Sequence, residues 1–78
     1  MNVMFSTHAQ CMGFQRAISK REIEHAIQHG VITAIQPNGR LVITDWLANV
    51  RVVVVRFDCD THLVITVYRP MSLPNKVQ

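Results

Sequence analysis

The stretch Ile18-Ser-Lys-Arg-Glu-Ile-Glu-His-Ala-Ile-Gln-His-Gly30 decides the fold, because it contains the signals for both ends of a helix. Ser19 is a favourable N-cap, and Glu22 three residues later completes a capping box. Gly30 stands where a left-handed residue commonly ends a helix. The apolar stripe between these ends consists of Ile23, Ala26 and Ile27. The stretch therefore predicts an amphipathic helix of about three turns, which needs an apolar surface to pack on.

The residues after Gly30 alternate between β-branched runs and turn residues, which is typical of strands. The predicted strands are residues 31–36, 40–46, 50–57 and 62–69. Before the central helix, Ser6 or Thr7 caps a first helix that reaches about Gln15, and an extended arm precedes it. Short links between strands favour antiparallel pairing in sequential order. We predict an α+β fold in which two N-terminal helices pack on one face of a four-stranded antiparallel meander sheet.

The period of two along each strand predicts which side chains face the helices. In the last strand these are Leu63, Ile65 and Val67, and in the third strand Val53, Val55 and Phe57. Thr66 and Tyr68 then lie on the open face, and Arg56 is assigned there because an unpaired arginine is hard to bury. Both faces remain apolar, so we expect a homodimer formed through the sheet.

Length and composition describe one modest domain, 1–78, with an ordered core over about 6–70 and a flexible tail, 71–78. The chain is 49% hydrophobic and carries a net charge of +3, which permits a polyanionic partner such as RNA. It lacks a secretion signal and any apolar run long enough to span a membrane. Two cysteines are too few for a secreted disulfide framework, so we expect reduced thiols in the cytoplasm and no membrane partner.

Three segments resemble the motifs of a small bacterial family of domains of unknown function. They are His8-Ala9, Arg16-x-Ile18-Ser19 and Val64-Ile-Thr-Val-Tyr68, and the resemblance extends over about residues 6–70. That family usually opens His-Ala-x-x-Arg, continues Arg-Gly-Ile-Ser and closes Val-Ile-Thr-Val-Tyr. It has been grouped with the ribonuclease-toxin fold of barnase, the EndoU nucleases, colicin-type tRNases and RelE-like mRNA interferases. The resemblance thus implies helices followed by an antiparallel sheet, with RNA as the substrate class.

The resemblance also implies candidate site residues for RNA cleavage without a metal. The catalytic candidates are His8, Arg16, Thr66 and Tyr68, and the nucleic-acid-binding candidates are Arg51 and Arg56. His8 would act as base or acid, because an unperturbed imidazole titrates near neutral pH. Arg16 would stabilise charge on the phosphate, and Tyr68 would position or protonate the substrate. We expect these groups to lie close together.

Two positions depart from the family pattern and support a second hypothesis. Met12 stands where the family has an arginine, and a methionine cannot supply a fixed cation to a scissile phosphate. Ala17 stands where the family has a glycine. The alternative is a non-catalytic, dimeric protein-interaction domain that kept the fold and lost the active site. An antitoxin-like protein encoded beside this chain would favour the toxin hypothesis over that alternative.

The histidines and cysteines were also weighed as zinc ligands. His25 and His29 lie four apart on the central helix, and Cys59-x-x-His62 lies on a predicted turn. These side chains are competent ligands, but the helix and the distant turn would have to meet. We therefore predict no metal site and no cofactor.

Overall fold

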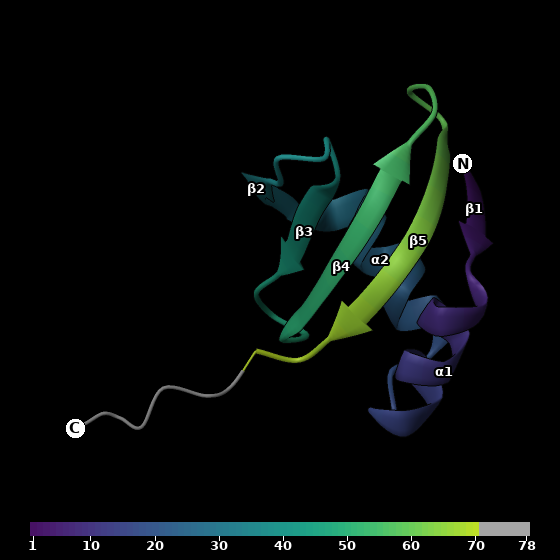
Figure 1. Ribbon diagram of the computed structural model, residues 1–78. Coiled ribbons are helices and arrows are strands. Elements are labelled where there is room, and N and C mark those ends of the chain that lie inside the picture. The colour runs from purple at the N-terminus through teal and green to yellow at the C-terminus, as the bar shows by residue number, and fades with distance from the viewer. Residues whose placement is uncertain (71–78) are drawn as a thin grey trace.

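The computed structural model describes residues 1–70, which form five strands and two helices (Figure 1). The strands are β1 (Asn2–Phe5), β2 (Val31–Ile35), β3 (Leu41–Asp45), β4 (Val50–Arg56) and β5 (Thr61–Tyr68), and the helices are α1 (Thr7–Gln15) and α2 (Lys20–His29). The predicted flexible tail, 71–78, lies outside the described residues. The predicted α+β class, with both helices ahead of the four sequential strands, is confirmed.

The sheet has five strands in the order β1-β5-β4-β3-β2, so the prediction of four antiparallel strands is wrong in one respect. The N-terminal arm adds β1, which runs parallel to β5 and pairs with it from Asn2 opposite Thr61 to Phe5 opposite Val64. Val3 and Phe5 pack against the hydrophobic core from this position. The arm therefore gains both ladder hydrogen bonds and apolar burial, which explains why it is ordered against the sheet.

Helix α2 begins as the sequence predicts. The Ser19 hydroxyl accepts a hydrogen bond from the Glu22 backbone N–H at 3.1 Å, and the Glu22 carboxylate accepts one from the Ser19 N–H at 3.1 Å. These two bonds satisfy N–H groups that would otherwise lack a partner in the first turn. The capping box is therefore confirmed, and it fixes where α2 starts.

The end of α2 differs from the prediction, because Gly30 is not left-handed. Its backbone is extended, with φ −77° and ψ 176°. A Cβ atom at this position would lie 2.8 Å from the Ile43 Cγ2 atom and 2.8 Å from the Thr44 carbonyl oxygen. It would also overlap the Ala26 carbonyl oxygen of α2, so glycine is required by the close approach of α2 and β3 and not by its backbone angles.

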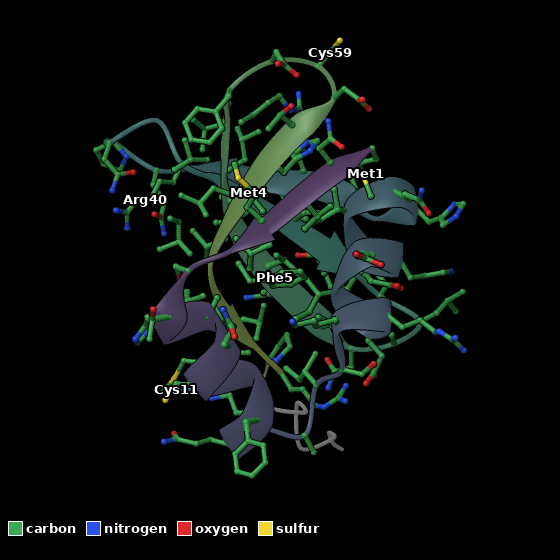
Figure 2. All side chains as sticks on the ribbon, turned by 90° about the vertical axis from the view of Figure 1, so that its right-hand side faces the viewer. Met1, Met4, Phe5, Cys11, Arg40 and Cys59 are labelled. Carbon is green, nitrogen blue, oxygen red and sulfur yellow. The ribbon has the colours of Figure 1, made fainter. Side chains whose placement is uncertain are left out.

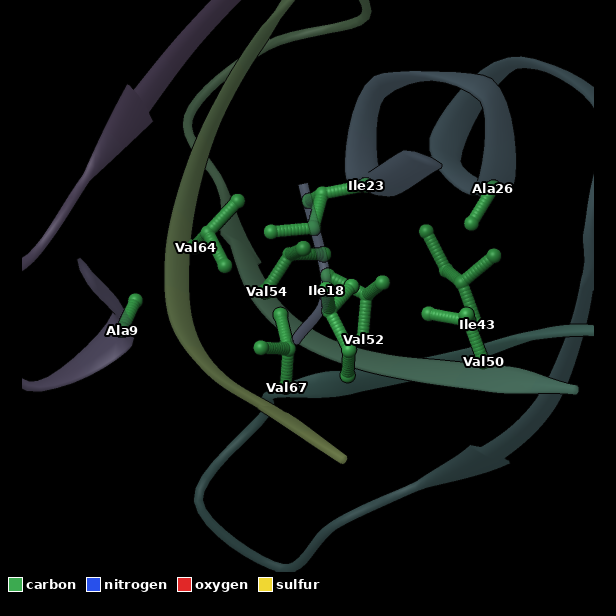
Figure 3. Packing of buried hydrophobic residues seen from close by; sticks show 10 residues of the cluster. All are labelled: Ala9, Ile18, Ile23, Ala26, Ile43, Val50, Val52, Val54, Val64 and Val67. Carbon is green, nitrogen blue, oxygen red and sulfur yellow. The ribbon is translucent and has the colours of Figure 1, made fainter. Parts of the chain in front are cut away.

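A single apolar cluster lies between α2 and the sheet, with Ala9 of α1 at its margin (Figure 3). Its members are Ala9, Ile18, Ile23, Ala26, Ile43, Val50, Val52, Val54, Val64 and Val67. The predicted core face of β4 is therefore wrong. Val52 and Val54 face α2, whereas Phe57 is 59% exposed. All seven residues of β4 are valine or arginine, so the period of two alone did not distinguish the faces.

A bulge divides β5 into two halves with different alternation. Thr66 pairs with Val53 and Val64 pairs with Val54, so Ile65 is an extra residue in the β5 strand. Val64 and Val67 consequently both enter the core, although they are three residues apart. The predicted orientation is right for Val67. It is wrong for Leu63, which precedes the bulge, and for Ile65, which is the bulged residue.

Arg69 connects the end of β5 to three neighbouring segments. Its guanidinium donates to the Ala48 carbonyl at 2.9 Å, the Ala17 carbonyl at 3.2 Å and the Glu22 carboxylate at 3.1 Å. The backbone hydrogen bond from Ser19, followed by the bond from Arg69, lowers the pKa of the Glu22 carboxyl below its ordinary value. Arg69 thereby ties the β3–β4 turn and the link between the helices to the sheet.

Ala17, in the link between the helices, has a left-handed backbone with φ 55°. A non-glycine residue in this region costs roughly 1–2 kcal/mol. We predict that Ala17→Gly increases the free energy of unfolding by about 1 kcal/mol, because relief of that strain exceeds the added entropy of the unfolded chain. Urea denaturation measures the change. Ala34→Gly in β2 is the matched control and should destabilise the protein by about 0.5–1 kcal/mol. Destabilisation by both substitutions would contradict the strain at Ala17.

Candidate nucleic-acid interface

Arg51 lies on the central strand of the sheet, near its beginning and on the face opposite α2. On β4 it pairs across the strands with Thr44 of β3 and with Tyr68 of β5. Facing side chains in such pairs have Cβ atoms about 4.5–5.5 Å apart. The Arg51 Nε atom is buried and has no hydrogen-bond partner. A guanidinium with an unsatisfied buried N–H is costly, since the group gives up hydration without receiving an acceptor.

The open face around Arg51 provides hydroxyl groups and no negative charge. The Thr33 and Thr44 hydroxyls are hydrogen-bonded to each other at 2.9 Å. Thr66 occupies the position opposite Val53, two pairs along from Tyr68 and on the same face. The strand residues of β2 to β5 on this face include no carboxylate. Arg51 thus lacks a counter-charge within the part of the chain that the structure describes.

The two predicted nucleic-acid-binding arginines do not lie together. Arg56 is five residues after Arg51 on β4, so its side chain points to the opposite face of the sheet at a distance of about 16 Å along the strand. There the Arg56 Nε atom donates a hydrogen bond to the His62 Nε2 atom at 3.2 Å. The assignment of Arg56 to the open face is therefore wrong. Arg56 avoids the cost of burying a charge on this face because it is the last residue of β4 and remains exposed.

His62 lies on the same face as Arg56 and is buried, with 5% of its surface exposed. Because the Nε2 atom accepts from Arg56, the Nδ1 atom carries the proton, and that buried N–H has no partner. Burial, followed by the charge of Arg56, lowers the pKa of His62, while Asp60 and Asp58 oppose the shift. The fold therefore favours neutral His62.

Helix α1 lies along the part of the β5 edge that β1 leaves free. At its start the Ser6 hydroxyl accepts from the Ala9 N–H at 3.0 Å and donates to the Ile65 carbonyl at 3.1 Å. At its end the Arg16 guanidinium donates to the Val67 carbonyl at 3.0 Å. Arg16 is thus next to Thr66 and Tyr68 along the edge of β5, and one of its donors is already engaged by the backbone.

His8 is exposed in the first turn of α1, two residues after Ser6. Residues three apart share one side of a helix, so His8 and Cys11 point in similar directions. Cys11 extends to the side of the molecule away from α2 (Figure 2). His8 therefore lies on the exposed side of α1. Within residues 1–70 no hydrogen bond joins His8 to Arg16 or Tyr68, and no pocket is found.

Met12 packs against the hydrophobic core and is half-buried. Where the resembling family has an arginine, this chain therefore contributes apolar packing. The candidate site contains Arg16 and Arg51 as cations, one at the edge of β5 and one near the start of the central strand β4. This arrangement can bind an extended anion on an open surface, with hydroxyl groups as additional donors.

Sequence reasoning missed a histidine–aspartate pair on the helix side. The His25 Nδ1 atom is 3.0 Å from the Asp45 Oδ2 atom, and the hydrogen bond from His25 lowers the pKa of the Asp45 carboxyl. The other Asp45 oxygen accepts from the Leu47 and Ala48 N–H groups. The sequence signal was Asp45 ahead of a turn, where it caps the backbone. Among the described residues no group of three or more potential ligands is arranged to hold a metal ion.

The fold and this face define a small α+β domain with an unpaired arginine on an open sheet surface. A family model, Domain of unknown function (DUF4258), matches residues 5–69, so the chain belongs to that family. Searches of curated proteins and of solved structures give no match. No helix within residues 1–70 is long and apolar enough to cross a membrane.

The environment of His62 predicts how stability depends on pH. An unfolded histidine titrates near pH 6.5, whereas folded His62 resists protonation, so the unfolded state binds more protons as the pH falls. We expect the free energy of unfolding to be insensitive to His62 above about pH 6.5 and to decrease as the pH falls from there toward 5. His62→Gln should flatten this decrease, as measured by urea denaturation at several pH values.

The exposed His29 provides the control for this experiment. His29→Gln removes one imidazole from the surface, so it should flatten the decrease in stability less than His62→Gln does. The pKa values of the Glu22, Asp45 and Asp58 carboxyls are also lowered, and their loss of stability falls mainly below pH 5, where unfolded carboxyls take up protons. An identical slope for the parent and His62→Gln between pH 7 and 5 would contradict the role of His62.

Proposed function

We propose that this domain binds RNA on the open face of its sheet, with Arg51 contacting a backbone phosphate. The observation that carries this proposal is the half-buried Arg51 side chain, whose Nε–H has no acceptor and whose face has no carboxylate. A phosphate would satisfy that donor and supply the missing counter-charge. The net charge of +3 favours the approach of a polyanion over the whole surface.

The neighbours of Arg51 suit a nucleic-acid strand. Tyr68, directly across from Arg51, offers an aromatic ring on which a base can stack, and stacking of this kind tolerates any base. The hydroxyl of Thr66, which lies half-buried on the same face, can donate to a phosphate or ribose oxygen. Arg16 at the edge of β5 adds a second cation, because a guanidinium has five donors and the Val67 carbonyl engages one. The resemblance to the ribonuclease-toxin fold supports RNA as the substrate class.

Binding without cleavage is the activity that this set of residues supports best. General acid–base cleavage requires a positioned histidine and fixed cations at the phosphate. His8 is exposed on α1, and Met12 replaces the arginine of the resembling family with a side chain that packs on the core. The alternative of a non-catalytic, dimeric interaction domain that lost the active site agrees with this loss of a cation. The two hypotheses differ in whether Arg51 binds nucleic acid.

Arginine substitutions on the two faces of β4 test the proposal. We predict that Arg51→Met weakens binding of a fluorescein-labelled single-stranded RNA about tenfold, as expected for loss of a charge-assisted hydrogen bond. The slope of log K against log salt should become less negative by about 0.7, because one phosphate contact is lost. Fluorescence anisotropy at several salt concentrations gives both quantities.

Arg56→Met is the matched control, since it removes the same charge from the same strand on the opposite face. It should leave the affinity and the salt slope close to those of the parent protein. Equal losses for the two variants would mean that binding depends only on net charge. Absence of RNA binding by the parent at low salt would refute the proposed function.

A cleavage assay separates binding from catalysis. We expect 5′-labelled RNA to remain intact with the parent protein in the presence of EDTA, because Met12 supplies no cation at the phosphate. Product analysis by gel electrophoresis measures this. If the parent cleaves RNA and His8→Ala does not, the catalytic hypothesis with His8 as acid or base replaces the binding hypothesis.

A further inference from the structure

Strand β2 forms one outer edge of the sheet and is exposed along its whole length. Within residues 1–70 it pairs with β3 alone, and all five of its residues are exposed. Its apolar side chains lie on both sheet faces. Val31 is 56% exposed, Ile32 43% and Ile35 71%. An edge strand of this kind presents unpaired backbone groups together with apolar side chains, which is the template for pairing with another strand.

The opposite edge of the sheet is protected in ways that β2 is not. There β1 is short, and beyond its end the Ser6 and Arg16 side chains satisfy the Ile65 and Val67 carbonyls. Proteins commonly guard edges with charged residues or proline within the strand. Residues 31–35 contain neither. The opposite outer strand, β1, also lacks charge and proline, but it is one residue shorter and its Val3 and Phe5 side chains pack against the core, so the exposed apolar edge surface lies mainly on β2.

The centre of the open face, by contrast, needs no cover. Val42 is 7% exposed, Thr44 1% and Val53 4%, although no helix lies over them. Neighbouring side chains of the twisted sheet already exclude water there. The exposed apolar surface of the sheet is therefore concentrated at the β2 edge, and self-association is expected at the edge instead of across the open face.

We propose that β2 pairs antiparallel with β2 of a second copy of this chain. A second β2 supplies an uncharged strand of the same length with apolar side chains on both faces, which matches the edge that it meets. Residues 31–39 include no charged side chain, so self-pairing brings no like charges into contact despite the net charge of +3. A partner strand with charged side chains would meet no complementary charge on β2.

The symmetry of this contact has a consequence for RNA binding. Two identical strands that pair antiparallel are related by a twofold axis perpendicular to the sheet. The open faces of both copies then lie on the same side of one continuous sheet, with Arg51 of each copy exposed to the same ligand. This consequence rests on the proposed function, whereas the pairing of the strands does not.

Sedimentation velocity over a concentration range from micromolar to millimolar tests the pairing. We expect the parent protein to shift with concentration from the 8.9 kDa chain mass toward twice that mass. Ile35→Lys places a charge at the exposed edge and should weaken dimerisation at least tenfold. Its folding can be checked by circular dichroism, and Val31→Lys provides a second variant of the same edge.

Two further lysine variants locate the contact. Leu47→Lys adds the same charge at a turn residue that is 99% exposed, and Met4→Lys adds it to the open face at a residue that is 47% exposed. Both should dimerise like the parent. A parent protein that stays monomeric throughout would overturn the proposal, and so would loss of dimerisation in Leu47→Lys or Met4→Lys. Arg51→Met should still dimerise, so failure of RNA binding and failure of strand pairing are separately observed.

Discussion

The bulge in β5 is the constraint on which the rest of the structure depends. One extra residue, Ile65, lets Val64 and Val67 both pack under the helices, and the same insertion leaves Thr66 and Tyr68 on the open face. Without it, a strict alternation that buried Val67 would have exposed Val64 and removed the contact with β1 and Ala9. The bulge also bends the strand where β1 ends. Helix α1 uses that point, because Ser6 binds the carbonyl of the bulged residue.

The sequence was sufficient where local chemistry decides the structure. The capping box at Ser19 and the order of the strands 31–68 follow from residue types and spacing that act over a few positions. The sequence was insufficient where a strand has apolar residues on both faces, because the pattern then does not show which face packs on the helices. In β4 the valines fit either face, and the choice depends on which of them meets Ile23 and Ala26 of α2. Strand β1 was missed for a related reason, since its pairing with β5 is a long-range contact that no local pattern encodes.

The candidate site shows the same division between local and long-range information. Thr66 and Tyr68 were placed on the open face correctly, because the parity of β5 after the bulge agrees with the prediction. Arg51 and Arg56 could not be separated by residue type. The register places Arg51 between Thr44 and Tyr68 without an acceptor, whereas Arg56 donates to His62. Arg69 was not singled out at all, since its three partners come from segments that are distant in sequence.

The unpaired cation and the unprotected edge belong to one sheet, and their spacing determines what they could do together. Successive strands are about 4.8 Å apart, so two copies joined at β2 would hold their Arg51 residues roughly 24 Å apart across the sheet. A single RNA strand of several nucleotides spans such a distance. Once Arg51 of one copy has bound a phosphate, the same RNA strand would be held close to Arg51 of the other copy. The effective concentration of RNA at this second arginine would then be high, and affinity would rise without any new type of contact. Under the proposed function, a 78-residue domain anchored through Arg51 would bind RNA weakly alone, and the proposed edge pairing would strengthen that binding.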